Sequence, residues 1–253
     1  MEVNQALIPI FIETEIPKGI KQIGTGVFID FRSQPFLFTA AHVTDSLQNG
    51  KLLVPTIEGL EEIEGYLAHL DLLPELSRND DSIDMAYYRL SNDFARKLFV
   101  YFQPLIKKIE LVESSLELNV LSVVGYPASK SKKNGGSFSS ELAYYRGIAA
   151  DNELYEKHNL LTDQNIIIHF HKKNALNPDN GQKMNPPSPR GVSGGAIFAW
   201  PYGQEFSQDW RLPMLVGILH SYKEKEGLFV GTTLLPYLTA TALGEMRGYS
   251  GLL

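Results

Sequence analysis

Three residue types that together can perform acyl transfer stand far apart in this chain. Ser193 lies inside the glycine-rich run GVSGG at 191–195, His42 follows the tripeptide Thr-Ala-Ala, and Asp84 precedes an apolar segment. A serine hydroxyl is a weak nucleophile at neutral pH, so it needs a base within hydrogen-bonding distance and a third group that orients the base. We therefore interpret Ser193 as a candidate nucleophile, His42 as its base and Asp84 as the residue that orients His42.

The glycines of this run suit the same chemistry. Glycine allows a sharp backbone turn and a close approach of a substrate carbonyl to the chain. The backbone N–H groups of Gly191 and Ser193 are then the expected donors of an oxyanion hole, and loss of one such donor slows a reaction by about 100- to 1,000-fold.

Other interpretations of these residues have less support. The run also fits the Gly-x-Ser-x-Gly motif of α/β-hydrolases, which requires a buried strand before the serine and a histidine after it. Residues 183–190 are instead polar and rich in proline, and His220 is the only later histidine, so we set this motif aside. Asp80 and Asp81 compete with Asp84 for the orienting role, but only Asp84 directly precedes the apolar segment.

Two further histidines raise the question of a metal. His169 and His171 lie two residues apart in a predicted strand, so they share one face of it. Zinc sites use three or four protein ligands, and no third ligand is apparent. We therefore expect a polar strand face here, and neither a metal nor another cofactor.

Composition limits the partners and the location. The 253 residues carry a net charge of -6 with 21% charged and 43% hydrophobic residues, which predicts a folded core and no phosphate-binding surface. Nucleic acid is therefore not an expected partner. The absence of cysteine, of a signal peptide at the N-terminus and of a run of about 18 apolar residues predicts a cytoplasmic protein without membrane contact.

Short apolar runs separated by turn residues predict an all-β protein. The runs at 26–29 and 35–39 flank a turn at 30–34 and predict a hairpin. Ser91 is a candidate helix cap, and residues 235–246 predict a C-terminal helix. Further strand candidates are 85–90, 118–124, 142–148, 165–170, 196–200, 214–219 and 227–232.

Taken together, the motifs and segments of this chain resemble those of the trypsin-like (chymotrypsin-fold) serine peptidases. The order His–Asp–Ser is typical of them, and the resemblance extends from about residue 24 to 232. The matching motifs are TAAH at 39–42, DMA at 84–86, VVGYP at 123–127, GVSGGA at 191–196 and LVGI at 215–218.

The resemblance implies an all-β fold of two six-stranded antiparallel β-barrels with a short C-terminal helix, together forming one peptidase domain. Residues 1–115 would form the barrel that carries His42 and Asp84, and residues 116–253 the barrel that carries Ser193. It also implies a serine endopeptidase that hydrolyses polypeptides through an acyl-enzyme intermediate.

The resemblance extends to substrate binding. It implies that an extended peptide pairs with the strand at 219–222, a mode in which main-chain hydrogen bonds supply affinity. Pro187 stands at the position that forms the base of the S1 pocket in digestive members, so no acid selects Lys or Arg, and we expect a small or apolar P1 residue. The predicted substrate-binding residues are Pro187, Leu219, His220, Ser221 and Tyr222.

One departure from the digestive members concerns activation. They carry an aspartate before the nucleophile that pairs with a newly cleaved N-terminus, whereas this chain has Val192. Activation by such cleavage is therefore not expected, which places the chain closer to the bacterial HtrA-like branch, although no PDZ domain follows. A regulatory protein partner or a disordered oxyanion loop could instead restrain the enzyme.

Two alternative functions follow from the same residues. The chain could be a protease-fold binding or regulatory module that is inactive or latent until a partner binds; the intact set of three residues argues against this. An esterase acting on small acyl esters would share the chemistry.

Overall fold

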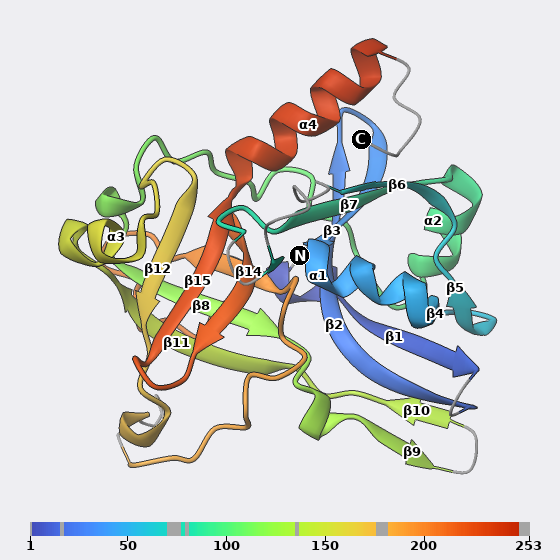
Figure 1. The fold of residues 1–253 in the computed structure, drawn as a ribbon, viewed down its shortest axis with the longest axis horizontal. Helices are drawn as coiled ribbons and strands as arrows, with labels where there is room; N and C mark the ends of the chain where they lie inside the picture. Colours follow the sequence, from blue (N-terminus) through green and yellow to red (C-terminus); the bar gives the residue numbers. More distant parts are fainter. Residues whose placement is uncertain are drawn as a thin grey trace.

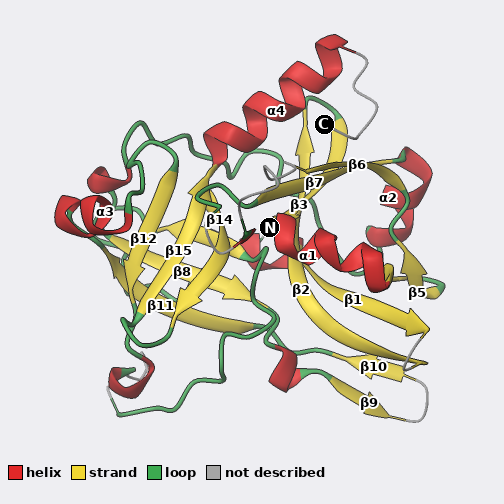
Figure 2. Cartoon of the chain, in the orientation of Figure 1, coloured by secondary structure: helices red, strands yellow, loops and turns green. Residues whose placement is uncertain are grey.

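A computed structural model describes residues 2–15, 18–69, 77–78, 81–134, 137–175 and 182–247 of the chain. These residues form two large antiparallel sheets, one from each half of the sequence, and a helix at their junction (Figures 1 and 2).

The first sheet has seven strands in the order β5-β4-β1-β2-β3-β7-β6. Its strands are β1 (Leu7–Glu15), β2 (Lys18–Phe31), β3 (Gln34–Ala40), β4 (Gly50–Thr56), β5 (Gly59–Glu62), β6 (Gly65–His69) and β7 (Met85–Leu90). β2 and β3 form the predicted hairpin, with Arg32 and Ser33 both at positive φ (54° and 61°) in the turn. Two such residues give a hairpin turn whose twist matches that of the strands.

The second sheet is a closed six-stranded barrel in the order β11-β12-β15-β14-β13-β8. Its strands are β8 (Val120–Gly125), β11 (Ala143–Ala149), β12 (Asn165–His169), β13 (Ala196–Ala199), β14 (Met214–Lys223) and β15 (Leu228–Thr233). A separate hairpin consists of β9 (Lys132–Asn134) and β10 (Ser137–Ser139). It reaches the first sheet through Phe138, whose ring lies 5.7 Å from that of Phe11.

Helices are few and short. They are α1 (Ala41–Thr44), α2 (Asn92–Leu98), α3 (Asn152–His158) and α4 (Leu234–Arg247), with 3-10 turns at Val3–Ala6, Asp45–Asn49, Ser115–Glu117, Ala128–Lys130 and Lys172–Asn174. The Ser91 hydroxyl accepts a hydrogen bond from the Phe94 N–H at 3.2 Å, which confirms its role as the cap of α2. No helix in the described part of the chain is long and apolar enough to cross a membrane.

The predicted all-β fold with a C-terminal helix is confirmed. In detail, the first half is a curled seven-stranded sheet, whereas the second half is the closed six-stranded barrel that was expected. The extra strand arises because β4 turns back at Gly59, where φ is 117°, and pairs with β5. The predicted division at 115/116 falls in the connection between β7 and β8, and the separation into two units stays a prediction.

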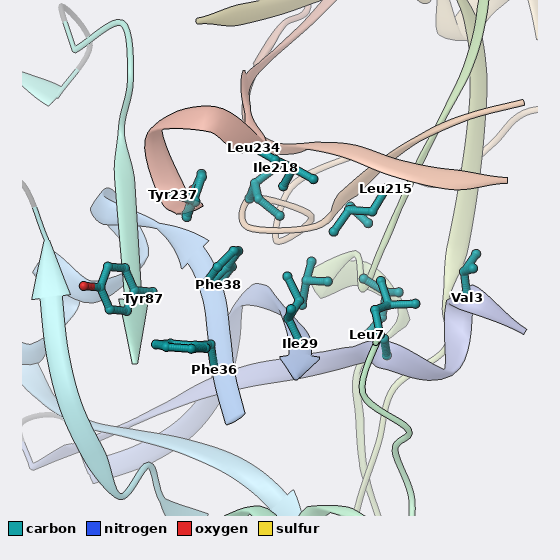
Figure 3. Packing of buried hydrophobic residues seen from close by; sticks show 14 of the residues in the cluster. Val3, Leu7, Ile29, Phe36, Phe38, Tyr87, Leu215, Ile218, Leu234 and Tyr237 are labelled. Carbon is teal, nitrogen blue, oxygen red and sulfur yellow. The ribbon is translucent and has the colours of Figure 1, made fainter. Parts of the chain in front are cut away.

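The two sheets share one apolar core (Figure 3). Leu7, Ile29 and Phe38 of the first sheet lie in the same buried cluster as Leu215 and Ile218 of the barrel. Because one cluster contains side chains from both sheets, the packing that stabilises each sheet also sets how the two meet.

Helix α4 completes this core at the junction. The Tyr237 ring stacks on Phe38 with centroids 4.9 Å apart, and its hydroxyl donates to the Thr39 carbonyl at 2.7 Å. Tyr237 is buried, so this hydrogen bond is shielded from water. Thr39 lies three residues before His42, so α4 supports the strand that leads into the candidate site.

We predict that Tyr237→Phe lowers the free energy of unfolding by about 0.5–1.5 kcal/mol, because it removes a buried hydrogen bond to the Thr39 carbonyl. Tyr202→Phe is the matched control, since that ring is 97% exposed and loses the same oxygen. Urea denaturation of both variants measures the difference. Equal stability of the two variants would contradict the role given to the Tyr237 hydroxyl.

Candidate active site

Strand register brings His42 and Asp84 together. Ala40, the last residue of β3, pairs with Met85, the first residue of β7, so the residues just beyond this pair lie side by side. The His42 Nδ1 lies 2.6 Å from one carboxylate oxygen of Asp84, and the His42 backbone N–H donates to the other at 2.9 Å. Two contacts to one carboxylate fix both the position and the orientation of the imidazole.

The backbone of Asp84 is itself unusual. Its φ is 40°, in the left-handed region that aspartate tolerates better than most residues. In this conformation the Asp84 carbonyl accepts the Ala41 N–H at 3.0 Å while its carboxylate faces His42. Burial alone would raise the pKa of the Asp84 carboxyl, but hydrogen bonds and positive charge from His42 lower it below its usual value. Asp84 is therefore a buried carboxylate held in its charged form.

The loop before Asp84 is anchored on two sides. Arg78 donates to both oxygens of Asp45, next to α1, at 2.7 and 3.1 Å, and to Asp81 at 2.8 Å. From the barrel, the side chains of Asn165 and Thr232 donate to the carbonyls of Ser82 and Ile83. The 3-10 turn after α1 and the barrel thus both position this loop, and none of these contacts was predicted from the sequence.

Hydrogen bonds to backbone carbonyls fix the orientation of the peptide groups in the turn that carries Ser193. The Arg190 carbonyl accepts from Ala128 N–H at 2.7 Å, so the N–H of the same peptide, that of Gly191, faces the opposite way. The Val192 carbonyl accepts from Gly195 N–H at 2.7 Å, which orients the Ser193 N–H in the same manner. Within the described part of the chain, neither the Gly191 N–H nor the Ser193 N–H has a hydrogen-bond partner. Two unpaired donors at one turn are what an oxyanion hole requires.

Backbone conformation and close packing explain why glycine occupies two positions of this turn. Gly191 and Gly194 have φ of 89° and 81°, which glycine adopts without strain. A Cβ on Gly194 would lie only 2.0 Å from the Thr25 carbonyl oxygen, so no other residue fits there.

The Ser193 hydroxyl points to a backbone carbonyl. It donates to the His220 carbonyl at 3.4 Å, and no hydrogen bond joins it to His42 among the residues the structure describes. A change of the Ser193 χ1 rotamer redirects the hydroxyl without moving the backbone. His220, whose carbonyl accepts this bond, has an imidazole that interacts electrostatically with both Asp84 and His42.

His220, one of the predicted substrate-binding residues, is a buried histidine. Its Nδ1 lies 2.9 Å from the Ser221 hydroxyl, and its Nε2 has no partner in the described residues. Burial lowers the pKa of His220 to about 4, a fall that the charge of Asp84 opposes and that of His42 reinforces. His220 is therefore neutral near pH 7.

The remaining predicted binding residues lie on β14 and before the turn. Leu219 exchanges hydrogen bonds with the turn: it accepts from Gly194 N–H at 2.7 Å and donates to the Gly195 carbonyl at 2.8 Å. Because β13 pairs with β14 only up to Ile218, no described strand covers that edge of β14 beyond Leu219. Ser221 lies on this uncovered stretch, beside the nucleophile turn.

Tyr222 and Pro187 contact an aromatic group in the barrel. The Tyr222 ring lies 4.8 Å from Phe229 and 6.2 Å from Phe170. Tyr145, which packs against the same rings, donates its hydroxyl to the Pro187 carbonyl at 3.4 Å. Val192 and Leu219, which flank the nucleophile turn, belong to the same apolar cluster.

No group of three His, Cys, Asp or Glu side chains that could hold a metal ion occurs among the described residues.

Comparison with known proteins gives the fold a context. No protein-family model matches the chain, and neither does any curated protein sequence. Among solved structures, neuropsin, a serine protease expressed in mouse brain, is 15% identical over 94% of this chain and 95% of its own, with a TM-score of 0.55. The VesB protease of Vibrio cholerae is 15% identical over 98% of this chain and 67% of its own, with a TM-score of 0.53.

A viral protein shows the same likeness. The serine protease domain of the Sesbania mosaic virus polyprotein is 15% identical over 94% of this chain and 92% of its own, with a TM-score of 0.50. At this level of identity the likeness concerns the fold alone. The chain has the trypsin-like fold that these proteases share.

We predict that His220 makes stability depend on pH. A pKa of about 4 in the folded state, against 6.5 for an ordinary histidine, means that the unfolded chain binds the proton more readily between these values. The free energy of unfolding should therefore fall as the pH falls from 6.5 to 4, by about 3 kcal/mol from this residue. Urea denaturation at pH 7.0, 5.5 and 4.5 measures this slope.

His220→Gln removes this titration, so the stability difference between the wild type and this variant should narrow as the pH falls. His169→Gln, in which an exposed histidine of β12 is replaced, is the control and should follow the wild-type slope. If the free energies of unfolding of the wild type and His220→Gln change with pH in parallel, His220 is not held neutral by burial.

Proposed function

We propose that this chain is a serine endopeptidase in which Ser193, His42 and Asp84 form a catalytic triad. The observation that carries the proposal is the nucleophile turn, whose N–H donors at Gly191 and Ser193 have no partner among the described residues, together with a His42 that is oriented by the buried Asp84. The trypsin-like fold adds support, because proteases such as neuropsin and VesB have it.

The proposed reaction follows the acyl-enzyme route. The Ser193 hydroxyl turns from the His220 carbonyl to His42, which takes its proton as the oxygen attacks the substrate carbonyl carbon. The N–H groups of Gly191 and Ser193 stabilise the negative oxygen of the tetrahedral intermediate. His42 then gives the proton to the amine as the C–N bond breaks, and water hydrolyses the acyl-enzyme by the same steps.

Asp84 and the surrounding burial complete the mechanism. The carboxylate keeps the proton of neutral His42 on Nδ1, so Nε2 is free to accept the proton of Ser193. When His42 becomes protonated, the negative charge of Asp84 stabilises it. The lowered pKa of Asp84 keeps this charge present at any pH at which a histidine base works.

The substrate would be an extended polypeptide. The uncovered edge of β14 beyond Leu219 offers main-chain groups to which a peptide strand can add. The small or apolar P1 residue stays a prediction from the sequence. The cytoplasmic location, the kinship with the bacterial HtrA-like branch and a regulatory protein partner stay predictions from the sequence.

A second candidate function is a protease-fold binding module without activity. The observation in its favour is the Ser193 hydroxyl, which donates to the His220 carbonyl rather than to His42. The unpaired donors of the nucleophile turn are unexplained by this alternative, and we therefore prefer the peptidase.

We predict that the purified protein reacts with a fluorophosphonate probe, which labels activated serines. Ser193→Ala should abolish both labelling and hydrolysis of unfolded casein, because no other serine shares this turn. Ser207→Ala, in which a serine of the β13–β14 connection is replaced, should leave both unchanged. A folded wild type that neither labels nor hydrolyses casein would favour the binding module.

We also predict that Asp84→Asn lowers kcat by about 10⁴-fold while the fold is retained. Asparagine tolerates a φ of 40° and keeps the shape of the side chain, but its amide no longer holds the correct His42 tautomer. Single-turnover assays together with a thermal melt test this. A loss of less than tenfold would remove Asp84 from the triad.

A further inference from the structure

Thr25, on β2 of the first sheet, is a buried residue that bonds to the nucleophile turn of the other sheet. Its backbone N–H donates to the Ser193 carbonyl at 2.8 Å, and its hydroxyl donates to the Gly191 carbonyl at 3.2 Å. The same hydroxyl accepts from the Tyr126 N–H at 2.9 Å, and the Thr25 carbonyl accepts from the Thr39 hydroxyl at 2.8 Å. Every polar group of this fully buried residue is thus engaged.

The Thr25 hydroxyl bonds to Gly191, and the conformation of Gly191 determines where the donors of the oxyanion hole point. Gly191 can adopt positive or negative φ, so the peptides on both sides of it are free to rotate unless other groups hold them. The peptide before Gly191 is held by the bond from Ala128 N–H to the Arg190 carbonyl. The peptide after it has its carbonyl held by Thr25 and its N–H, that of Val192, bonded to the Pro189 carbonyl at 3.0 Å.

The space around the Thr25 hydroxyl is closely fitted. A Cβ on Gly125 would lie 2.9 Å from this oxygen, so the hydroxyl sits directly against the backbone of β8. Val192, the residue that follows Gly191, is fully buried in the apolar cluster of the barrel. An apolar side chain there needs no ionic partner, and the turn keeps its shape through Thr25 and this apolar contact.

We propose that Thr25 is a positioning residue that holds the nucleophile turn in its donor-ready conformation from across the junction of the two sheets. The inference rests on the proposed peptidase function and adds a statement about its regulation. The turn is assembled by groups within the chain itself, so the isolated protein is competent without cleavage of its N-terminus and without an activating partner.

The test compares variants that keep or remove the hydroxyl. Thr25→Val keeps the size of the side chain and loses both hydrogen bonds of the hydroxyl, whereas Thr25→Ser retains them. We expect Thr25→Val to lower kcat about 10- to 100-fold with KM changed by about twofold or less, because the oxyanion donors act in the transition state rather than on the bound substrate. Thr25→Ser should stay within about threefold of the wild type, because its hydroxyl keeps the turn in place.

Binding of a peptidyl boronic acid gives a second measure. This inhibitor forms a tetrahedral adduct with the active serine, so its affinity should fall in Thr25→Val by the same factor as kcat. Thr233→Val is the matched control, because Thr233 is a buried threonine whose hydroxyl donates to the Asp163 carbonyl at 2.9 Å, away from the turn. It should lose stability without losing kcat or boronate affinity.

The outcomes separate the two proposals. If the wild type labels with the fluorophosphonate probe but Thr25→Val and Thr233→Val behave alike, the inference on Thr25 is overturned and the peptidase stands. If the folded wild type does not label at all, the proposed function fails, and the claim of competence without a partner fails with it. Crystal structures of the wild type and Thr25→Val then show directly whether the Gly191 peptides rotate when the hydroxyl is removed.

Discussion

The backbones of β2 and the nucleophile turn approach each other so closely that no side chain fits between them. A Cβ on Gly194 would meet the Thr25 carbonyl oxygen at 2.0 Å, and one on Gly24 would lie 3.3 Å from the Ser193 carbonyl oxygen. Buried backbone groups have to be hydrogen-bonded, and here the Thr25 N–H and the Ser193 carbonyl satisfy each other across the two sheets. The geometry of the candidate nucleophile therefore depends on how the sheets dock.

This docking is stabilised by apolar packing rather than by charge. The shared cluster contains Phe38, Leu215 and Ile218, and α4 closes it through Tyr237 (Figure 3). Close packing of this kind resists small displacements, since a gap between the sheets would forfeit many contacts at once. Such a core can hold two halves of a catalytic site at fixed distances while the residues themselves stay free to exchange protons.

Charge is concentrated where the chemistry requires it. Asp84 is buried yet stays ionised because His42 supplies both hydrogen bonds and positive charge, whereas His220, buried without such a partner at Nε2, is neutral near pH 7. A second positive charge beside His42 would disfavour protonation of the base. A neutral His220 thus adds no positive charge beside His42.

The sequence by itself determined the β2–β3 hairpin, the start of α2 at Ser91 and the C-terminal helix, because residue types and periodicity over a few positions carry these features. It also named the residues of the candidate triad, which stays a prediction. The sequence analysis did not predict β4, β5, β6, β9 or β10, since short strands with mixed polar and apolar residues show no clear alternation. Only the tertiary structure decided that Thr25 bonds to Gly191, 166 positions away. It also decided that Arg78 forms ion pairs with both Asp45 and Asp81, and that His220 interacts electrostatically with Asp84. These contacts depend on closure of the barrel and on the docking of two sheets, and neither leaves a local signal in the residues that make them.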